Sequence, residues 1–320
     1  MMLAPVVGVT ASRAARRAEA VATGPLGALS HDELSVIVEG LADPLEPVVA
    51  VALSSTCLGL RTPMQAALKV LKGQHLRAAA LCHEVHTSGW PCSCAALRDE
   101  AHLAWAGRVL FVSHMKTLGM LLRTNGLSRL QTLDLSYNYF GDVGMQALCE
   151  GMGRAALPSL ITLRVTGNII LKRDAVFGPV GAEALAAALI KGAMPTLEHL
   201  SLGCNPIGKQ GIAALVAPLR KLRALKELFL YACDIGDEGA ASLVANVGKD
   251  DFKELKELAL DANDLTDTGC ITLATALKGG VMPGLKFGHL DLEDNHDASD
   301  EARRAVNQAL LARSGSSQER

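Results

Sequence analysis

The sequence predicts an α/β solenoid in which parallel strands alternate with helices, preceded by a small all-helical N-terminal domain. Three observations support this prediction. A leucine pattern that ends in Asn or Cys recurs six times along the C-terminal part of the chain. Most copies are followed by a run that combines glycine with helix-spaced apolar residues. Of the 320 residues, 49% are hydrophobic but only 3% are aromatic, so the core must be built mainly from leucine, valine and alanine.

Residues 1–27 are expected to form a disordered tail or an organelle transit segment. They carry Arg13, Arg16 and Arg17 against one acid, Glu19, in an alanine-rich context. Transit segments share this composition, and so do ordinary disordered termini. No basic region precedes the short LAPVVGV run, so we expect no secretory signal. The last residues, 313–320, are expected to form a second disordered tail.

Residues 28–108 are predicted to form the helical domain. An S-x-x-E spacing near the start of this segment is that of a capping box, which marks a helix N-terminus. Leu34, Ile37 and Leu41 then recur at helical intervals. Pro44 breaks this predicted helix, and a second apolar segment follows it.

Part of this domain contains the runs LSHDELSVIVEGLADP and SSTCLGL, within residues 28–71. These runs resemble the opening and the end of an F-box, a short helical motif that docks the adaptor of a cullin–RING ubiquitin ligase. The resemblance implies adaptor contacts from Leu34, Ile37, Leu41 and Pro44. The aromatic residue common near the end of the motif is missing, and Pro47 interrupts its middle. The alternative is that the domain only caps the repeats.

A cluster of soft ligands lies in the stretch CHEVHTSGWPCSC, which contains Cys82, His83, His86, Cys92 and Cys94. Such side chains can hold zinc. However, Cys-x-Cys closes a tetrahedral site less well than Cys-x-x-Cys, and no second paired ligand set follows, so we predict no metal site. The other cysteines lie singly in apolar patterns, as expected of buried thiols in a reducing compartment.

Residues 109–312 are predicted to form the solenoid. After a degenerate capping repeat at 107–126, the pattern L-x-x-L-x-L-x-x-N/C ends at Asn138, Asn168, Asn205, Cys233, Asn263 and Asn295. Its alternating leucines point to one face of a strand, and the run that follows predicts an amphipathic helix. Asp142, Asp237 and Asp267 stand at the start of such runs, where we expect them to cap the helix. One strand–helix unit cannot bury its apolar face, whereas stacked copies share a continuous core.

The repeated pattern resembles the leucine-rich repeat family, in its long, ribonuclease-inhibitor-like subclass. The resemblance covers residues 110–312 and implies a horseshoe with the strands on its concave side. It also implies a non-catalytic role in binding other proteins. The Asn or Cys that ends each pattern is implied to satisfy buried backbone groups as a structural ladder. We therefore interpret Cys233 as a buried structural thiol, not as a metal ligand or nucleophile.

One repeat is longer than the others, because Asn168 and Asn205 lie 37 residues apart. The extra residues, Ile169–Ala175, follow the predicted strand, so we expect them to form a loop at one rim of the stack. Two interpretations stay open for this loop. It is a functional rim loop, or it is a neutral insertion or an artefact of the gene model, because surface loops tolerate added length at small cost.

The outward-facing strand positions form the predicted binding face. Its candidate partner-contacting residues are Asp134, Tyr137, Arg164, His199, Glu227, Phe229, Tyr231, Glu257, Asp261 and Asp291. Acidic residues dominate this face, and Arg164 is its one firm cation, which favours a basic protein partner. Phe229 and Tyr231 form an aromatic pair of the kind found at binding hot spots. The alternative is a solvated face that binds nothing.

Composition and motifs narrow the function classes. The net charge of −2 argues against nucleic-acid binding, and the longest apolar run, VVAVAL, is far too short to span a membrane. No catalytic or cofactor-binding motif occurs, so we expect neither an enzyme nor a cofactor. Two functions stay open: a substrate receptor of a cullin–RING ligase, and a scaffold or regulator such as a small-GTPase effector. We expect a cytoplasmic or nuclear protein, with the transit segment as the open alternative.

Overall fold

The structure is a computed structural model that describes residues 37, 43–56, 58–85, 93–124, 127–168, 176–248 and 251–315. Several residues singled out in the sequence lie outside this described part. They are the predicted tail 1–27, Leu34, Leu41, His86, Cys92, the Ile169–Ala175 segment and residues 316–320. The first three residues of the predicted tail at 313–320 are instead helical, because the last helix runs to Gly315.

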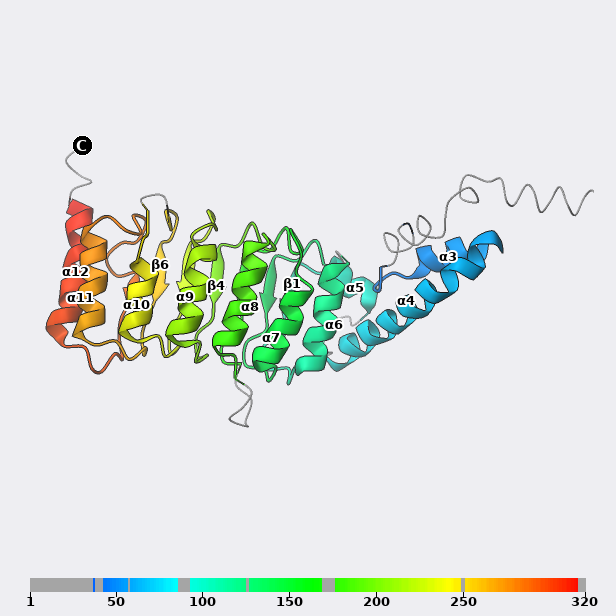
Figure 1. The fold of residues 1–320 in the computed structure, drawn as a ribbon, viewed down its shortest axis with the longest axis horizontal. Coiled ribbons are helices and arrows are strands. Elements are labelled where there is room, and N and C mark those ends of the chain that lie inside the picture. Colours follow the sequence, from blue (N-terminus) through cyan, green and yellow to red (C-terminus); the bar gives the residue numbers. More distant parts are fainter. Residues whose placement is uncertain are drawn as a thin grey trace, which may run out of the picture.

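Seven parallel strands form one open sheet whose spatial order follows the chain (Figure 1). The strands are β1 (His102–Ala104), β2 (Thr132–Asp134), β3 (Thr162–Arg164), β4 (His199–Ser201), β5 (Glu227–Phe229), β6 (Glu257–Ala259) and β7 (Leu290–Asp291). The central leucines are in register, so that Leu133 pairs with Leu163 and Leu228 with Leu258. Each strand therefore contributes one buried leucine to a continuous row.

A helix follows each strand and packs beside the helix of the next repeat (Figure 1). These helices are α6 (Val112–Arg123), α7 (Gly141–Glu150), α8 (Pro179–Ile190), α9 (Gly208–Leu219), α10 (Gly236–Val244), α11 (Asp267–Lys278) and α12 (Asp300–Gly315). The core lies between the sheet and this row of helices, and it consists mostly of leucine. The predicted α/β solenoid is thereby confirmed.

The N-terminal part of the described chain is helical. It contains α3 (Val48–Thr56), α4 (Leu58–Glu84) and α5 (Cys94–Asp99). Helix α4 packs against α3, α5 and α6, and Figure 1 shows α3 and α4 extending away from the row of repeats.

The first repeat differs from the sequence-based expectation. Its strand, β1, lies at residues 102–104, inside the segment assigned to the helical domain and upstream of the proposed capping repeat at 107–126. In β1 the register places Trp105 where β2 has its second leucine, Leu135, and both side chains are buried. Counting on from that register, Arg108 takes the place of the ladder asparagine. Because of these two replacements, the first repeat does not match the leucine pattern.

The ladder residues are fully buried and tie successive repeats together. Asn263 is representative: its side-chain amide donates to the carbonyls of Leu230 (2.7 Å) and Asp261 (3.0 Å). Its side-chain oxygen accepts from the backbone N–H of Cys233 at 2.9 Å. The thiol of Cys233 donates in turn to the carbonyl of Leu202 at 3.4 Å. Burial raises the pKa of this thiol to about 12, so it stays neutral and acts as a hydrogen-bond donor.

Each ladder residue follows a residue with left-handed backbone geometry. These residues are Tyr137, Gly167, Cys204, Ala232, Ala262 and Asp294, with φ between 50° and 64°. A left-handed residue turns the chain sharply at the end of the strand, which brings the ladder side chain under the turn. Five of the six positions hold a residue other than glycine, so this backbone strain recurs along the solenoid.

The aspartates at the helix starts differ from the prediction that each caps its own helix. Asp142 lies in the first turn of α7, yet its carboxylate accepts from the backbone N–H groups of Gly178 (2.8 Å) and Gly181 (2.6 Å). Those two residues begin α8 in the next repeat. Because neighbouring helices start at the same edge of the stack, an aspartate at one N-terminus reaches the exposed donors of the next.

Candidate functional site

All ten candidate partner-contacting residues are exposed or half-buried. Tyr137, Arg164 and Asp291 are exposed, and the other seven are half-buried. The smaller outward-facing residues between them, such as Ser201 and Thr166, are buried beneath larger neighbours. The strand face therefore presents long and charged side chains above a floor of small ones.

Two tyrosines lie over glycines in the middle of this face. A Cβ added to Gly203 would lie 2.4 Å from Cζ of Tyr231, and one added to Gly167 would lie 2.8 Å from Cδ1 of Tyr137. Each ring therefore occupies space that only glycine leaves free. Burial raises the pKa of Tyr231, while a hydrogen bond with Thr166 acts in the opposite direction. The two aromatic rings consequently have fixed positions that a partner can use.

Ion pairs engage part of the predicted face at β4 and β5. Nδ1 of His199 lies 2.8 Å from a carboxylate oxygen of Glu227, although the two atoms are not aligned as a hydrogen bond. Beside them, the ammonium of Lys226 lies 2.5 Å from the carboxylate of Glu198. Lys226 and Glu198 were not singled out in the sequence. Glu227 is therefore less available to a partner than its strand position suggests.

A hollow lies at the C-terminal end of the face, with a volume of about 640 Å³. It is lined by Phe229, Tyr231, Glu257, Leu258, Ala259, Asp261, Phe287, Gly288, His289, Leu290, Asp291, Leu292, Glu293, Arg303 and Asn307. The strand register explains the hollow, because Ala259 lies between Phe229 of β5 and Asp291 of β7. A methyl group at this position leaves room between two larger side chains.

Five residues of the hollow belong to the predicted set, namely Phe229, Tyr231, Glu257, Asp261 and Asp291, and three of the others come from outside the predicted strands. Phe287 precedes β7, while Arg303 and Asn307 project from α12. Residues 303 and 307 lie one helical turn apart, so they share a face of α12. The alternation of residues 287, 289 and 291 is a signal that extends the strand face backwards to Phe287. The sequence contains no comparable signal that would predict the position of α12 at this end of the sheet.

The hollow has an acidic lining. Four carboxylates belong to it: Glu257, Asp261, Asp291 and Glu293. Burial raises the pKa of Asp261, and repulsion from Asp291, Asp294 and Glu293 raises it further. Arg303 is the single Lys or Arg in the lining, and its guanidinium is engaged by Asp300 at 2.6 Å. The hollow therefore favours a cation over an anion or a neutral group.

The residues implied by the F-box resemblance are only partly described. Pro44 is buried, and its carbonyl oxygen lies 2.8 Å from Nδ1 of His75 in α4. Its side chain therefore packs inside the helical domain and is not offered to a partner in this conformation. Ile37 is half-buried. On α3, by contrast, Val48 and Val49 are 68% and 50% exposed.

The structure also bears on metals and membranes. Within the described ranges, no group of three or more His, Cys, Asp or Glu side chains is arranged to hold a metal ion. Cys82 is buried and Cys94 half-buried, whereas two other members of that cysteine–histidine stretch are not described. Among the helices that the structure describes, none combines the length and the apolar character needed to cross a membrane.

Comparison with known proteins identifies the repeats. Four segments match a family model described as Leucine Rich repeat, and they are residues 128–149, 193–216, 222–244 and 255–274. No curated protein matches the chain. Taken with the open parallel sheet, the match shows that the fold is an α/β leucine-rich repeat solenoid. Repeats of this type typically form non-catalytic surfaces that bind other proteins.

Proposed function

We propose that this chain is a non-catalytic module that holds a basic segment of a partner protein on its concave strand face. The observation that carries the proposal is the acidic hollow beside Ala259. Its four carboxylates surround a space with Phe229 and Tyr231 on one side and Phe287 on the other. We also assign the repeats to the long ribonuclease-inhibitor-like subclass, because a full α-helix follows each strand.

A lysine or arginine side chain matches this hollow in charge and in shape. Its aliphatic stem can lie over Ala259 and between the rings of Phe229 and Phe287, while its charged end meets the carboxylates. The aromatic rings add attraction for a cation that lies over their faces. The summed field of the acidic side chains also speeds the encounter with a basic partner.

The experiment is a titration of the full chain with a fluorescein-labelled lysine- and arginine-rich peptide, read by fluorescence anisotropy. We expect Asp261→Asn combined with Asp291→Asn to weaken binding at least about tenfold, because two charges leave the hollow. The matched control is Glu183→Gln with Glu254→Gln, which removes two exposed carboxylates elsewhere. Equal losses in the two variants would show general charge attraction, and the hollow would then not be the binding site.

The substrate-receptor role in a cullin–RING ligase is a second proposal, favoured by the exposed valines of α3. Val48 and Val49 present apolar surface within the F-box-like segment 28–71, as a docking helix would. The test is a pull-down of purified ligase adaptor by the full chain. We expect Val48→Asp with Val49→Asp to abolish adaptor capture, whereas Val143→Asp on exposed α7 surface should leave it unchanged. If the intact chain captures no adaptor, the scaffold or regulator role is favoured instead.

A further inference from the structure

A second hollow lies between α4 and α6, where the helical domain meets the solenoid. It has a volume of about 450 Å³. Its lining includes Arg77, Leu81 and Glu84 of α4 and Lys116, Met120 and Arg123 of α6. Glu84, at the end of α4, pairs with His114, near the start of α6. We call this hollow the α4–α6 groove.

The charge of the α4–α6 groove is opposite to that of the concave hollow. Arg77, Lys116 and Arg123 are exposed, and none of them forms an ion pair within the described part of the chain. Glu84 is the one acidic residue of the lining, and His114 already engages it. Three cations therefore face this groove with their charge available to a ligand.

The three cations are distributed along the groove and across its two walls. Lys116 and Arg123 lie seven residues apart on α6, which is about 10 Å along a helix axis. Arg77 approaches from the other wall. A segment that carries several acidic side chains can pair with each of these cations separately. Leu81 is buried and Met120 half-buried, so an apolar floor accompanies the charges.

We propose that the α4–α6 groove binds an acidic, amphipathic segment of another protein. Its acidic side chains pair with Arg77, Lys116 and Arg123, and its apolar side chains lie along Leu81 and Met120. The chain itself is a poor source of such a segment. Outside the described residues, its longest acidic run is Asp32–Glu33. The groove and the concave hollow would then hold partner segments of opposite charge at two separate places on the solenoid.

The test uses the full chain and a short fluorescein-labelled peptide with Glu and Leu in heptad positions, read by fluorescence anisotropy. The groove variant is Lys116→Glu with Arg123→Glu. The matched control, Lys221→Glu with Lys253→Glu, makes the same charge change at two exposed lysines elsewhere. We expect binding at least about tenfold weaker for the groove variant and changed by less than about twofold for the control. Lys116→Gln with Arg123→Gln serves as the milder groove variant if the reversal lowers thermal stability.

Three results would overturn the proposal. The first is no saturable binding of the peptide to the unaltered chain, and the second is an equal loss in the groove and control variants. The third is displacement of the peptide by inorganic phosphate at similar concentration, because that result describes a single-anion site. The lysine-rich peptide used for the concave hollow should not compete, so failure here and failure of the concave-face proposal are separate outcomes.

Discussion

Asp237 and Gly269 join two successive repeats through a hydrogen bond of 3.0 Å from the backbone N–H of Gly269 to the Asp237 carboxylate. The same carboxylate oxygen accepts from the backbone N–H of Thr266 at 2.9 Å, and its second oxygen accepts from the Thr266 hydroxyl at 2.6 Å. Asp237 belongs to the first turn of α10, whereas Thr266 and Gly269 begin α11. One side chain thus satisfies the free donors of the following helix and fixes its position.

Glycine is required at position 269 by this contact. A Cβ added there would lie 2.3 Å from the Asp237 carboxylate. We expect Gly269→Ala to lower the free energy of unfolding by roughly 1–3 kcal/mol, because the cap must shift and leave donors unpaired. Gly73→Ala in α4 is the control, since nothing lies within 4 Å of the added Cβ. That change should stabilise the chain by roughly 0.5–1 kcal/mol. Urea unfolding measures both, and equal effects would contradict the capping role.

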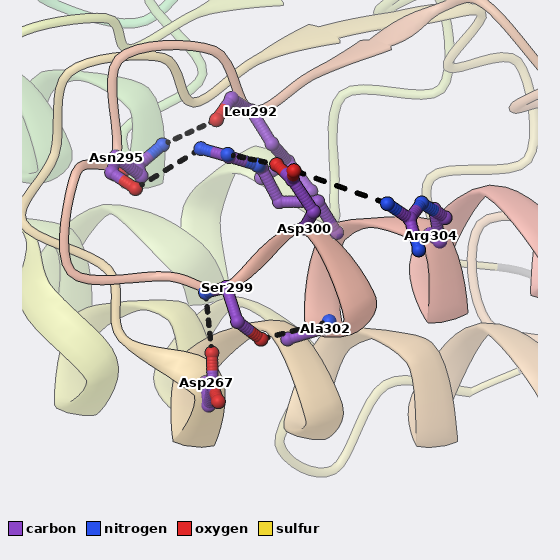
Figure 2. Close-up of polar contacts among 8 residues, drawn as sticks. Asp267, Leu292, Asn295, Ser299, Asp300, Ala302 and Arg304 are labelled. Carbon is purple, nitrogen blue, oxygen red and sulfur yellow. Dashed lines mark hydrogen bonds and ion pairs between the residues drawn. The ribbon is translucent and has the colours of Figure 1, made fainter.

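The junction between α11 and α12 allows a pH test of the same aspartate cap. Figure 2 shows Asp267 beside Ser299, whose backbone N–H donates to the carboxylate at 2.6 Å. This bond lowers the pKa of Asp267. A carboxylate with a lowered folded-state pKa stabilises the fold above its unfolded pKa of about 3.9, and that stability is lost as pH falls through the folded-state value. We expect Asp267→Asn to lower the melting temperature at neutral pH and to have no effect near pH 2. A constant difference across that range would rule out the charge of Asp267 as the cause.

The junction between α11 and α12 lacks a glycine at the position equivalent to Gly269. Ala302 of α12 occupies the position that Gly269 holds in α11, and its backbone N–H is bonded to the Ser299 hydroxyl at 3.2 Å instead of to Asp267 (Figure 2). Asp267 consequently accepts one backbone N–H group where Asp237 accepts two.

The acidic hollow should destabilise the chain at neutral pH. Asp261 has a raised pKa, so the folded state binds its proton more tightly than the unfolded state does. The ionised form therefore costs stability above the folded-state pKa. This cost shrinks as pH falls through that pKa and is gone below the unfolded pKa of about 3.9. We expect Asp261→Asn to raise the melting temperature at pH 7 and to lose this advantage on acidification. Glu254→Gln, an exposed carboxylate outside the hollow, should change neither value. A lower melting temperature for Asp261→Asn at pH 7 would contradict the repulsion.

The ladder predicts different tolerance at its asparagine and cysteine positions. Cys233→Asn should be nearly neutral, because an amide supplies the same donors to the carbonyls of Leu202 and Tyr231. Asn263→Ala should lower the free energy of unfolding by roughly 1–3 kcal/mol, since buried backbone groups lose their partners. With its pKa raised to about 12, Cys233 should react with a thiol reagent far more slowly than half-buried Cys204. Labelling of native Cys233 as fast as Cys204 would contradict its structural role.

The solenoid could be predicted from its sequence wherever a repeat retains the leucine pattern of its strand. Leu133, Leu163 and Leu200 mark strands directly, because alternation along a strand is a local property. Contacts between repeats are different. The spacing of Asp142 relative to α7 indicates a cap, but it does not reveal that the capped helix is α8. Likewise, Arg303 and Asn307 line the hollow only because α12 ends the stack beside β7, a relationship between distant segments.

The concave-face proposal predicts that charge and aromatic contacts affect different rate constants. Glu257 and Asp261 act on a basic partner at a distance through their summed field, so Glu257→Lys with Asp261→Lys should mainly slow association. Tyr231 acts by contact after docking, so Tyr231→Ala should mainly speed dissociation. Stopped-flow measurements with the lysine- and arginine-rich peptide separate the two rate constants. Association to the unaltered chain should also slow as salt rises toward physiological strength, where the screening length is about 8 Å.

Glu183→Lys with Glu254→Lys, on exposed surface away from the strands, should alter neither rate constant appreciably. If the strand-face and control reversals slow association equally, the partner responds to net charge and not to the hollow.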